Sequence, residues 1–421
     1  MSDTPLLPLA AMIGLDWGKE RHDIALQMTG TAGVEVIRLE HTPAAIADWL
    51  ATLAQRVAGG TVGVALETSR GAIVHALLEV PWVVLYPVNP RSLKRFREAM
   101  SPNGAKDDGP DARLLLDLLT KHRERLTPWR PADDVTRTLD RLVRQRRALV
   151  DLRTKLTLML QAVLTEYYPL ALTVAGTDLS RPLACAFLQR WPTLAAVQRA
   201  RATTVRRFYT AHHCRSEARI TERLTAIAAA RPLTTDPAII DPSALYAQAL
   251  VGQLLALGTP ITRVEEALAA AFAQHPDASL FQSLPGAGTT FAPRLAAAFG
   301  TDRTRFPSAA DVQQAAGIAP ITIRSGKSCV IHWRWATSKF LRQTFHEFAQ
   351  YSLPHVAWAH AFYRTQRQRG KSHHAAIRAL AFKWIRIIWR CWHDKTRYDN
   401  ARYERALAER RSPLSAQLAA A

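Results

Sequence analysis

Four acidic residues have the type and the placing that a divalent cation needs. Asp16 ends a β-type run in GLDWG, and Glu67 ends a later one, TVGVALE. Asp108 and Asp111 stand three apart in KDDGPDA, where Pro110 suits a first helical position, so both can face the same way. Because carboxylate oxygens are the ligands that Mg²⁺ prefers, we expect these four to hold it for phosphodiester chemistry. A strand-end aspartate is also a common turn residue, and Asp108 fits a simple helix cap equally well.

A serine among cations is the second candidate for chemistry. Ser325 lies in RSGKS, with Arg324 before it and Lys327 two residues after it. Positive charge beside a serine oxygen that attacks a phosphodiester stabilises the charge of the transition state. Taken alone, the pentapeptide fits a solvent-exposed turn better than a nucleophile.

A glycine-rich turn, LPGAG, follows the middle of the chain at residues 284–288. It has the form of the turn in a helix-hairpin-helix element. Gly286 and Gly288 would let backbone N–H groups approach a DNA phosphate without side-chain obstruction. Alone, the motif could be any glycine-rich turn.

The elements that must position these residues fall into an α/β region followed by helical ones. Three β-type runs are followed by alternating helices and strands, which indicates a layered domain with a mixed sheet. The expected strands are 11–16, 22–29, 34–40, 61–67 and 81–88, and the expected helices are 43–57 and 70–79.

A long amphipathic helix is expected after Pro131. Apolar residues recur every seven positions until Tyr167-Tyr168-Pro169, which predicts a coiled coil, and residues 243–274 could pack back against it. The heptad residues are Val135, Leu142, Leu149, Leu156 and Val163, with Leu152 and Met159 as companions. Seven basic residues and two acids lie between Arg137 and Lys155. We expect Arg146 and Arg153 among them to contact nucleic acid, although such a run is more often only a solvated face.

Composition narrows the class of partner. The 421 residues carry a net charge of +20, which requires a polyanion, and nucleic acid is the usual one. Residues 321–399 hold 15 basic residues, 3 acids and six of the eleven Trp, which suits a nucleic-acid surface, although Trp384, Trp389 and Trp392 could equally be core. The four isolated cysteines fit a reducing compartment, and neither a signal peptide nor a membrane span is expected.

Taken in order, these pieces resemble the transposases of insertion-sequence family 110. The matching segments are GLDWGKERHDIAL, ALETSRG, KDDGPDA, LPGAG, FPSAADVQQAAGIAP, RSGKS and AFYRTQRQRGKSHHAAIRALAFKWIRIIW. The resemblance covers most of residues 11–400, and residues 170–240 contribute little to it.

The resemblance implies an α/β plus all-α protein. It would have an RNase H-like (RuvC-like) mixed-sheet domain over 1–127, a helical coiled-coil domain over 128–275, a mostly helical transposase domain over 276–400 and a tail over 401–421. The acidic set maps to Asp16, Glu67, Asp108 and Asp111, and the nucleophile to Ser325, with Ser328 in reserve.

The function expected from all this is that of a DNA transposase or recombinase, which cuts and rejoins DNA through a serine–DNA covalent intermediate. The implied cofactor is Mg²⁺, and the implied partners are donor and target duplex DNA and a structured bridge RNA as guide. The chain is expected to form a dimer or a tetramer and to act in the bacterial cytoplasm at the nucleoid. The main alternative is a magnesium-dependent, junction-resolving endonuclease that acts by hydrolysis. A non-catalytic nucleic-acid-binding protein and a sugar-kinase-like phosphotransferase are weaker alternatives.

Overall fold

The computed structural model of the protein describes residues 7–67, 71–100, 108–129, 131–326, 328–332, 334 and 337–419. The side chains of residues 100, 108–110, 323, 325, 331, 416, 417 and 419 lie outside the description. The chain packs into two compact units. The first is Met1–Ala132 with Gln314–Lys339, and the second is Asp133–Gln313 with Phe340–Ala421. The division over 1–127, 128–275, 276–400 and 401–421 that the resemblance implies stays a prediction.

A five-stranded mixed sheet forms the centre of the first unit. Its strands are β1 (Ala11–Trp17), β2 (Arg21–Met28), β3 (Glu35–Glu40), β4 (Val62–Leu66) and β5 (Val83–Pro87). The order is β3-β2-β1-β4-β5, with β1, β2 and β3 antiparallel and with β4 and β5 parallel to β1. The expected RNase H-like mixed sheet is confirmed.

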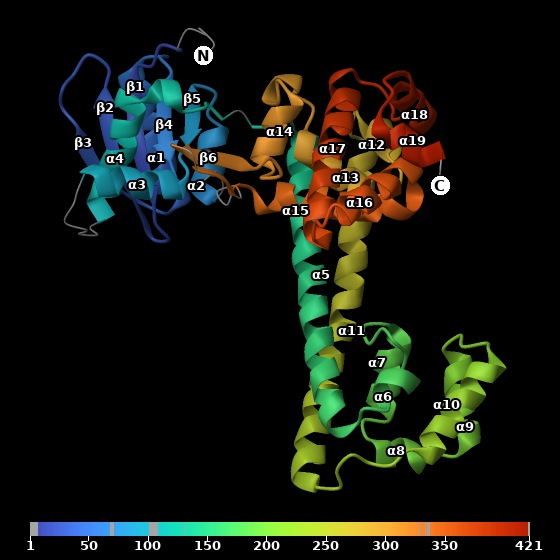
Figure 1. Ribbon diagram of the computed structural model, residues 1–421. Coiled ribbons are helices and arrows are strands. Elements are labelled where there is room, and N and C mark those ends of the chain that lie inside the picture. The colour runs from blue at the N-terminus through green and yellow to red at the C-terminus, as the bar shows by residue number, and fades with distance from the viewer. Residues whose placement is uncertain are drawn as a thin grey trace. The chain divides into compact units, whose positions relative to one another are not determined.

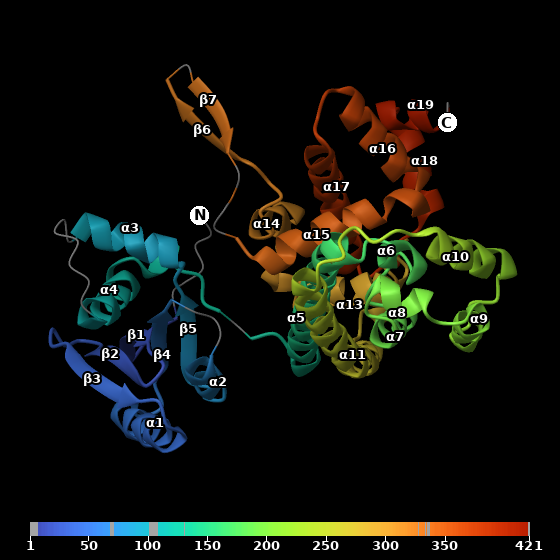
Figure 2. The same ribbon diagram turned by 90° about the horizontal axis from the view of Figure 1, so that it is seen from below.

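Helices cover both faces of this sheet. They are α1 (Pro43–Val57), α2 (Ala72–Leu78), α3 (Pro90–Met100) and α4 (Asp108–Lys121), followed by the short η1 (Arg123–Arg125). Alternate strand residues such as Ile13 and Val64 are buried with α1 and α2, whereas Ala65 and Tyr86 are buried with α3 and α4. Figure 2 shows α3 and α4 on one side of the sheet and α1 on the other. The two layers bury both faces and fix the strand ends.

The same unit contains a two-stranded hairpin, made of β6 (Ile321–Ser325) and β7 (Ser328–His332). The strands are antiparallel, and Ser325 pairs with Ser328 as the last pair before the turn. Gly326 in that turn has φ +56°, a left-handed conformation that glycine adopts without strain.

Two long antiparallel helices dominate the second unit (Figure 1). They are α5 (Asp134–Tyr167) and α11 (Pro237–Ala273). Asp133 caps α5 by accepting the amide of Thr136. Between them come α6 (Ala171–Val174), α7 (Pro182–Arg190), α8 (Leu194–Gln198), α9 (Ala202–Ala211) and α10 (Glu217–Ala229). These five pack with the end of α5 and the start of α11 into one hydrophobic core.

The rest of the second unit is helical as well. Its elements are α12 (Ala278–Gln282), α13 (Gly288–Phe299), η2 (Arg303–Arg305), α14 (Ala309–Ala315), α15 (Lys339–Tyr351), η3 (Leu353–His355), α16 (Ala357–Gln368), α17 (His373–His393), α18 (Asn400–Glu409) and α19 (Pro413–Ala419), of which α14 and α15 begin or end in the first unit. The expected α/β plus all-α layout is confirmed.

The buried stripe of α5 differs from the predicted heptads. The buried residues are Thr136, Leu139, Val143, Leu156, Leu160, Leu164 and Tyr167. Of the predicted residues only Leu156 is fully buried, and Leu152 is 44% exposed. Within each half of the helix the buried residues are three or four apart, as the 3.6-residue helical period requires.

The tryptophans of α17 are mainly core residues. Trp384 and Trp392 are fully buried, and their indole N–H groups donate to Ser352 Oγ (2.8 Å) and to the Gly300 carbonyl (2.7 Å). The half-buried Trp389 donates to the carbonyl of Phe306. The packing interpretation therefore accounts for these side chains.

The cysteines and the most apolar helix bear on two further expectations, a reducing compartment and the absence of a membrane span. All four cysteines are free. Within the described part of the chain, one helix, α11, is long and apolar enough to cross a membrane by length and composition. Its buried residues, among them Leu250 and Leu254, pack against α5 and the helices that follow it.

Candidate active site and nucleic-acid interface

Asp16 and Glu67 stand at neighbouring strand ends. In the parallel pair of β1 and β4, Leu15 is opposite Leu66, so the next residues along, Asp16 and Glu67, are adjacent in register. Because strand side chains alternate between faces, Asp16 shares the face of Gly14, which is the face that α4 covers. Both acidic residues are half-buried. The structure therefore brings these two carboxylates to one edge of the sheet.

α4 lies directly on β1. A Cβ added to Gly14 would come within 1.9 Å of the Ala112 carbonyl oxygen and 2.4 Å of the Leu116 nitrogen. Further along α4, Leu119 Cδ2 lies 3.4 Å from the place that a Cβ added to Gly63 would take, and Gly63 is near the start of β4. α4 therefore runs opposite to β1 and β4, and its N-terminus points toward their carboxyl ends.

This crossing brings the backbone of Asp108 to the acidic edge. Asp108 begins α4, one turn before Ala112, and one turn advances about 6 Å. The two strand residues from Gly14 to Asp16 advance a similar distance, about 6.6 Å. Asp108 is therefore level with Asp16 along the strand axis, and its side chain lies outside the described residues.

Asp111, the fourth predicted acid, already has a counter-ion. Arg97 of α3 donates through Nη2 to Asp111 Oδ2, and the two side chains are 24% and 17% exposed. A metal ion at Asp111 would therefore compete with a partly buried guanidinium. No local sequence pattern indicates this pair, because Arg97 comes from a different helix.

Asp23 of β2 is an acidic residue that the sequence analysis missed. It pairs directly with Asp16 across the antiparallel strands, so both occupy the same face. Arg38 Nε lies 3.5 Å from Asp23 Oδ1, and the aspartate side chain is 21% exposed. Two like charges in direct opposition are destabilising, and a bound cation would relieve the repulsion. The alternation of side chains along the strand HDIAL could have indicated Asp23. It places Asp23 on the face of the sheet opposite to that of the buried Ile24.

A divalent metal at the acidic edge would meet two described carboxylates, those of Asp16 and Glu67. Over the described residues, no three His, Cys, Asp or Glu side chains are grouped closely enough to hold an ion. Asp16 and Glu67 nevertheless offer hard oxygen donors at adjacent positions, and the backbone of Asp108 stands at the same level. The carboxylates of Asp16 and Glu67 have the donor chemistry that suits Mg²⁺, and Asp111 would join them only on release from Arg97.

The candidate serines flank the turn of the β6–β7 hairpin. Ser325 ends β6, Ser328 begins β7, and the two are opposite each other in register. Ser328 is exposed, and Arg324, also exposed, pairs with Cys329 one position further from the turn. Lys327 lies outside the described residues. The hairpin therefore puts both serines at one tip, and strand register does not separate them.

The LPGAG turn joins α12 to α13, as a helix-hairpin-helix element requires. Gly286 has φ +74° and is packed: an added Cβ would lie 2.6 Å from His355 Cδ2 and 3.2 Å from the Tyr351 carbonyl oxygen. Gly288 has φ +50°, is exposed and has open space where a Cβ would stand. Gly288 is thus accessible to a phosphate, whereas packing alone accounts for glycine at 286.

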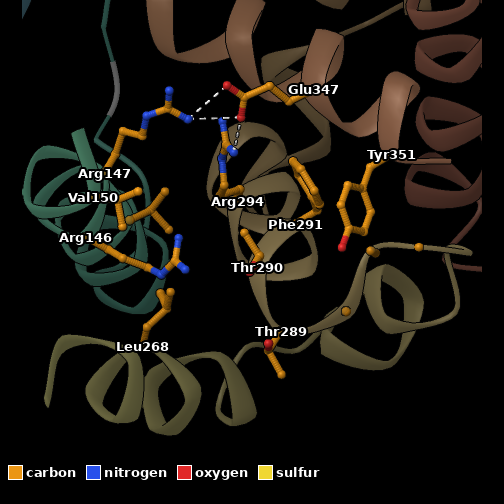
Figure 3. Close-up of a pocket in the computed structure, with 14 residues that line it drawn as sticks. Arg146, Arg147, Val150, Leu268, Thr289, Thr290, Phe291, Arg294, Glu347 and Tyr351 are labelled. Atoms are coloured by element: carbon orange, nitrogen blue, oxygen red, sulfur yellow. Dashed lines mark hydrogen bonds and ion pairs between the residues drawn. The ribbon is translucent and has the colours of Figure 1, made fainter. Parts of the chain in front are cut away.

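The two candidate arginines of α5 differ in setting. Arg146 forms an ion pair with Glu265 of α11 (Nη2–Oε1 2.6 Å) and lines a cavity beside the LPGAG turn (Figure 3). Arg153, two turns further along α5, is half-buried and lies outside that cavity. Only Arg146 is brought together with Gly286 and Gly288.

Fold and site together define an RNase H-like domain with an acidic strand edge, joined to an arginine-rich helical unit. Residues 13–169 match a family model described as "Transposase", and residues 278–364 match one described as "Transposase IS116/IS110/IS902 family". The chain belongs to this family of transposases, as the ordered motifs predicted. It is thus a transposase of a mobile element, a class of enzyme that cuts DNA.

Relatives in bacteria match from about 70% to more than 90% of the chain. The mini-circle putative transposase for IS117 of Streptomyces coelicolor is 28% identical over 94% of this chain and 96% of its own length. The IS900 uncharacterized 42 kDa protein of Mycobacterium paratuberculosis is 25% identical over 92% and 97%. The IS110 uncharacterized 43.6 kDa protein of Streptomyces coelicolor is 27% identical over 71% and 73%.

Proposed function

We propose that this transposase cuts and rejoins DNA through a covalent bond to Ser325, assisted by a metal held at the acidic edge. The observation that carries the proposal is the register of β1 and β4, which sets Asp16 beside Glu67 under the start of α4. Carboxylates gathered at a strand edge beneath a helix N-terminus suit hard cations at a phosphodiester. The serine step rests on the family resemblance and on the hairpin tip.

In the proposed step the Ser325 hydroxyl attacks phosphorus. An oxygen–phosphorus bond forms, one backbone phosphorus–oxygen bond breaks, the serine proton leaves, and the released DNA end takes up a proton to become a hydroxyl. Rejoining reverses this, since a DNA hydroxyl attacks the phosphoserine and frees the serine. Mg²⁺, when bound, supplies Lewis-acid stabilisation of charge on the phosphate oxygens. Asp16, Glu67 and Asp108 would hold it, and Arg324 and Lys327 add positive charge near the serine.

Duplex DNA contact is assigned in this proposal to Arg146, Arg153 and Gly288, with Gly286 shaping the turn. The remaining parts of the proposal rest on the family resemblance. They are a structured bridge RNA as guide, assembly into a dimer or tetramer, and residence in the bacterial cytoplasm at the nucleoid. Purification of the chain expressed with the non-coding DNA that flanks its gene tests the guide. Recovery of protein free of that RNA, with full recombination activity, would reject it.

The serine is tested by trapping a protein–DNA adduct on nicked suicide substrates. Ser325→Ala is expected to give no adduct and Ser328→Ala to keep it, because both variants share the hairpin and its charge. The reverse result would move the nucleophile to Ser328. If DNA is cut without any adduct in the unmodified protein, cleavage is hydrolytic and the chain acts as a magnesium-dependent nuclease.

A further inference from the structure

A cavity of about 340 Å³ in the second unit is lined by three arginines from two helices (Figure 3). Arg146 and Arg147 come from α5, and Arg294 comes from α13. Glu347 of α15 is the single acidic side chain among the described residues that line it. Cationic walls around an open space of this size are suited to an anion.

Glu347 bridges two of these arginines. Arg147 Nη1 donates to Glu347 Oε1 at 2.9 Å, and Arg294 Nη1 donates to Oε2 at 2.7 Å. Figure 3 shows both guanidinium groups converging on this carboxylate. Burial raises the pKa of Glu347, but the Arg294 hydrogen bond and the charges of both arginines outweigh it, so the net pKa is lowered. Glu347 is therefore a carboxylate in the position that a phosphate would take between two guanidinium groups.

The remaining counter-ions are solvent-exposed. Arg146 pairs with Glu265, whose side chain is 44% exposed, and Arg147 Nε also donates to Asp151, which is 60% exposed. Exposed pairs contribute little to stability and give way readily to a better ligand. Arg294 is only 7% exposed, and Glu347 supplies the counter-charge that a buried guanidinium needs.

The facing wall adds hydrogen-bond donors. Gly288, Thr289 and Thr290 begin α13 and line the cavity, and the first N–H groups of a helix lack partners within the helix. Arginine side chains and the backbone N–H groups of helix N-termini are both common donors to nucleic-acid phosphates. Residues that carry both kinds of donor line this one cavity.

We propose that this cavity binds a backbone phosphate of duplex DNA, and that Glu347 is the internal counter-ion that this phosphate replaces. The inference rests on the proposed function only in taking DNA as the polyanion. Before binding, Glu347 holds Arg147 and Arg294 in place and keeps the buried guanidinium neutralised. On binding, the two non-bridging phosphate oxygens accept from the same guanidinium groups, whose fork suits them.

The test measures binding of a fluorescein-labelled, random-sequence DNA duplex by anisotropy, on the full chain. Glu347→Gln keeps the shape and a hydrogen-bond acceptor but removes the competing charge, so affinity should rise severalfold. Glu166→Gln is the matched control: it changes the net charge equally on exposed surface, about 28 Å along α5 from Arg147. Arg147→Gln should weaken binding about tenfold and reduce the salt slope by about one.

Equal effects of Glu347→Gln and Glu166→Gln would overturn the proposal, as would unchanged affinity of Arg147→Gln. Thermal unfolding of each variant shows whether Glu347→Gln is folded, and Arg147→Gln at the cavity rim keeps the test decisive if it is not. The same titrations with a labelled RNA hairpin form the second arm, and a response confined to RNA rejects DNA as the ligand. Adduct formation at Ser325 is scored separately, so failure of the serine chemistry leaves this result interpretable.

Discussion

Gly14 of β1 and Ala112 of α4 touch through their main chains. The place of a Cβ at Gly14 lies 1.9 Å from the Ala112 carbonyl oxygen, so no side chain fits there without moving α4. Since α4 also carries Asp108 and Asp111, this one close approach sets where half of the acidic set stands relative to Asp16.

Gly14→Ala is therefore expected to lower the free energy of unfolding by about 3 kcal/mol, the upper part of the usual range for overpacking. It should also reduce strand cleavage, because α4 and its acids are displaced from the strand edge. Urea unfolding measures the first effect and a plasmid recombination assay the second. Gly33→Ala is the control, because a Cβ at Gly33 meets nothing within 4 Å. Equal stability of the two variants would contradict the close packing.

Replacing Asp16, Glu67 or Asp108 by Ala should abolish cleavage while DNA affinity and fold persist, because these side chains would serve a metal and not a core. Cleavage at varied Mg²⁺ and duplex binding by anisotropy measure the two properties. Asp117→Asn, at the other end of α4 and 43% exposed in a surface pair with Lys121, is a control that should keep activity. Full recombination by any of the three Ala variants would remove that residue from the metal site.

Asp23→Asn should act differently from these variants. It removes the charge directly opposite Asp16 while keeping the strand pair, so the unfolding free energy in the absence of divalent metal should rise slightly. If Asp23 helps to hold the ion, the Mg²⁺ concentration for half-maximal cleavage should increase. An unchanged Mg²⁺ dependence would limit Asp23 to a structural pair with Arg38.

Duplex binding should depend steeply on salt, with log K falling by roughly 0.9 for each phosphate that is neutralised. Arg153→Gln should reduce that slope by about one if Arg153 contacts a phosphate. Arg181→Gln is the matched control, since that exposed arginine of the second unit pairs with Asp178. A flat salt response in the unmodified protein would reject phosphate contact altogether.

His22 makes the first unit sensitive to acid. It is fully buried in β2, its Nε2 lies 2.8 Å from His41 Nδ1, and its Nδ1 has no hydrogen-bond partner among the described atoms. Burial, followed by the nearby His41, lowers the pKa of His22 below 6.5, outweighing Asp23. The unfolded chain therefore binds the proton first, so stability is complete above pH 6.5 and is lost as the pH falls through 6.5 toward the folded pKa. Urea midpoints at pH 7.5 and 5.5 should converge in His22→Gln, and an unchanged difference would exclude His22 as the cause.

Local pattern predicted the first unit well, because its strands are short, apolar and bounded by turns. Asp16 and Glu67 were identified as strand ends, and strand order then made them neighbours. Asp23 was missed because its importance depends on the antiparallel register with β1, and the Arg97–Asp111 pair because it joins two helices. Neither the Asp16–Asp23 pairing nor the Arg97–Asp111 ion pair can be recognised from a short stretch of adjacent residues.

In the helical unit, sequence pattern showed the helices but not their contacts. A seven-residue repeat in α5 suggested one continuous seam, yet Leu152 is exposed because the buried stripe drifts with the helical period. Gly286 was assigned to phosphate contact by motif, whereas its Cβ position is filled by His355, a residue 69 positions later. Glu347 could not be identified from sequence, because its neighbours Arg147 and Arg294 come from other helices.

The antiparallel pairing of α5 with α11 has a consequence for the order of folding. Arg146 and Glu265 are far apart in sequence, and closing so long a loop costs entropy before any contact repays it. The five helices between α5 and α11 pack with the adjoining ends of both into one core, in which Phe187, Trp191 and Phe208 are in mutual ring contact. We expect this insertion to collapse first and so shorten the loop to be closed. Pulsed hydrogen exchange during refolding should then protect amides of α7 and α9 before those of α5 near Arg146.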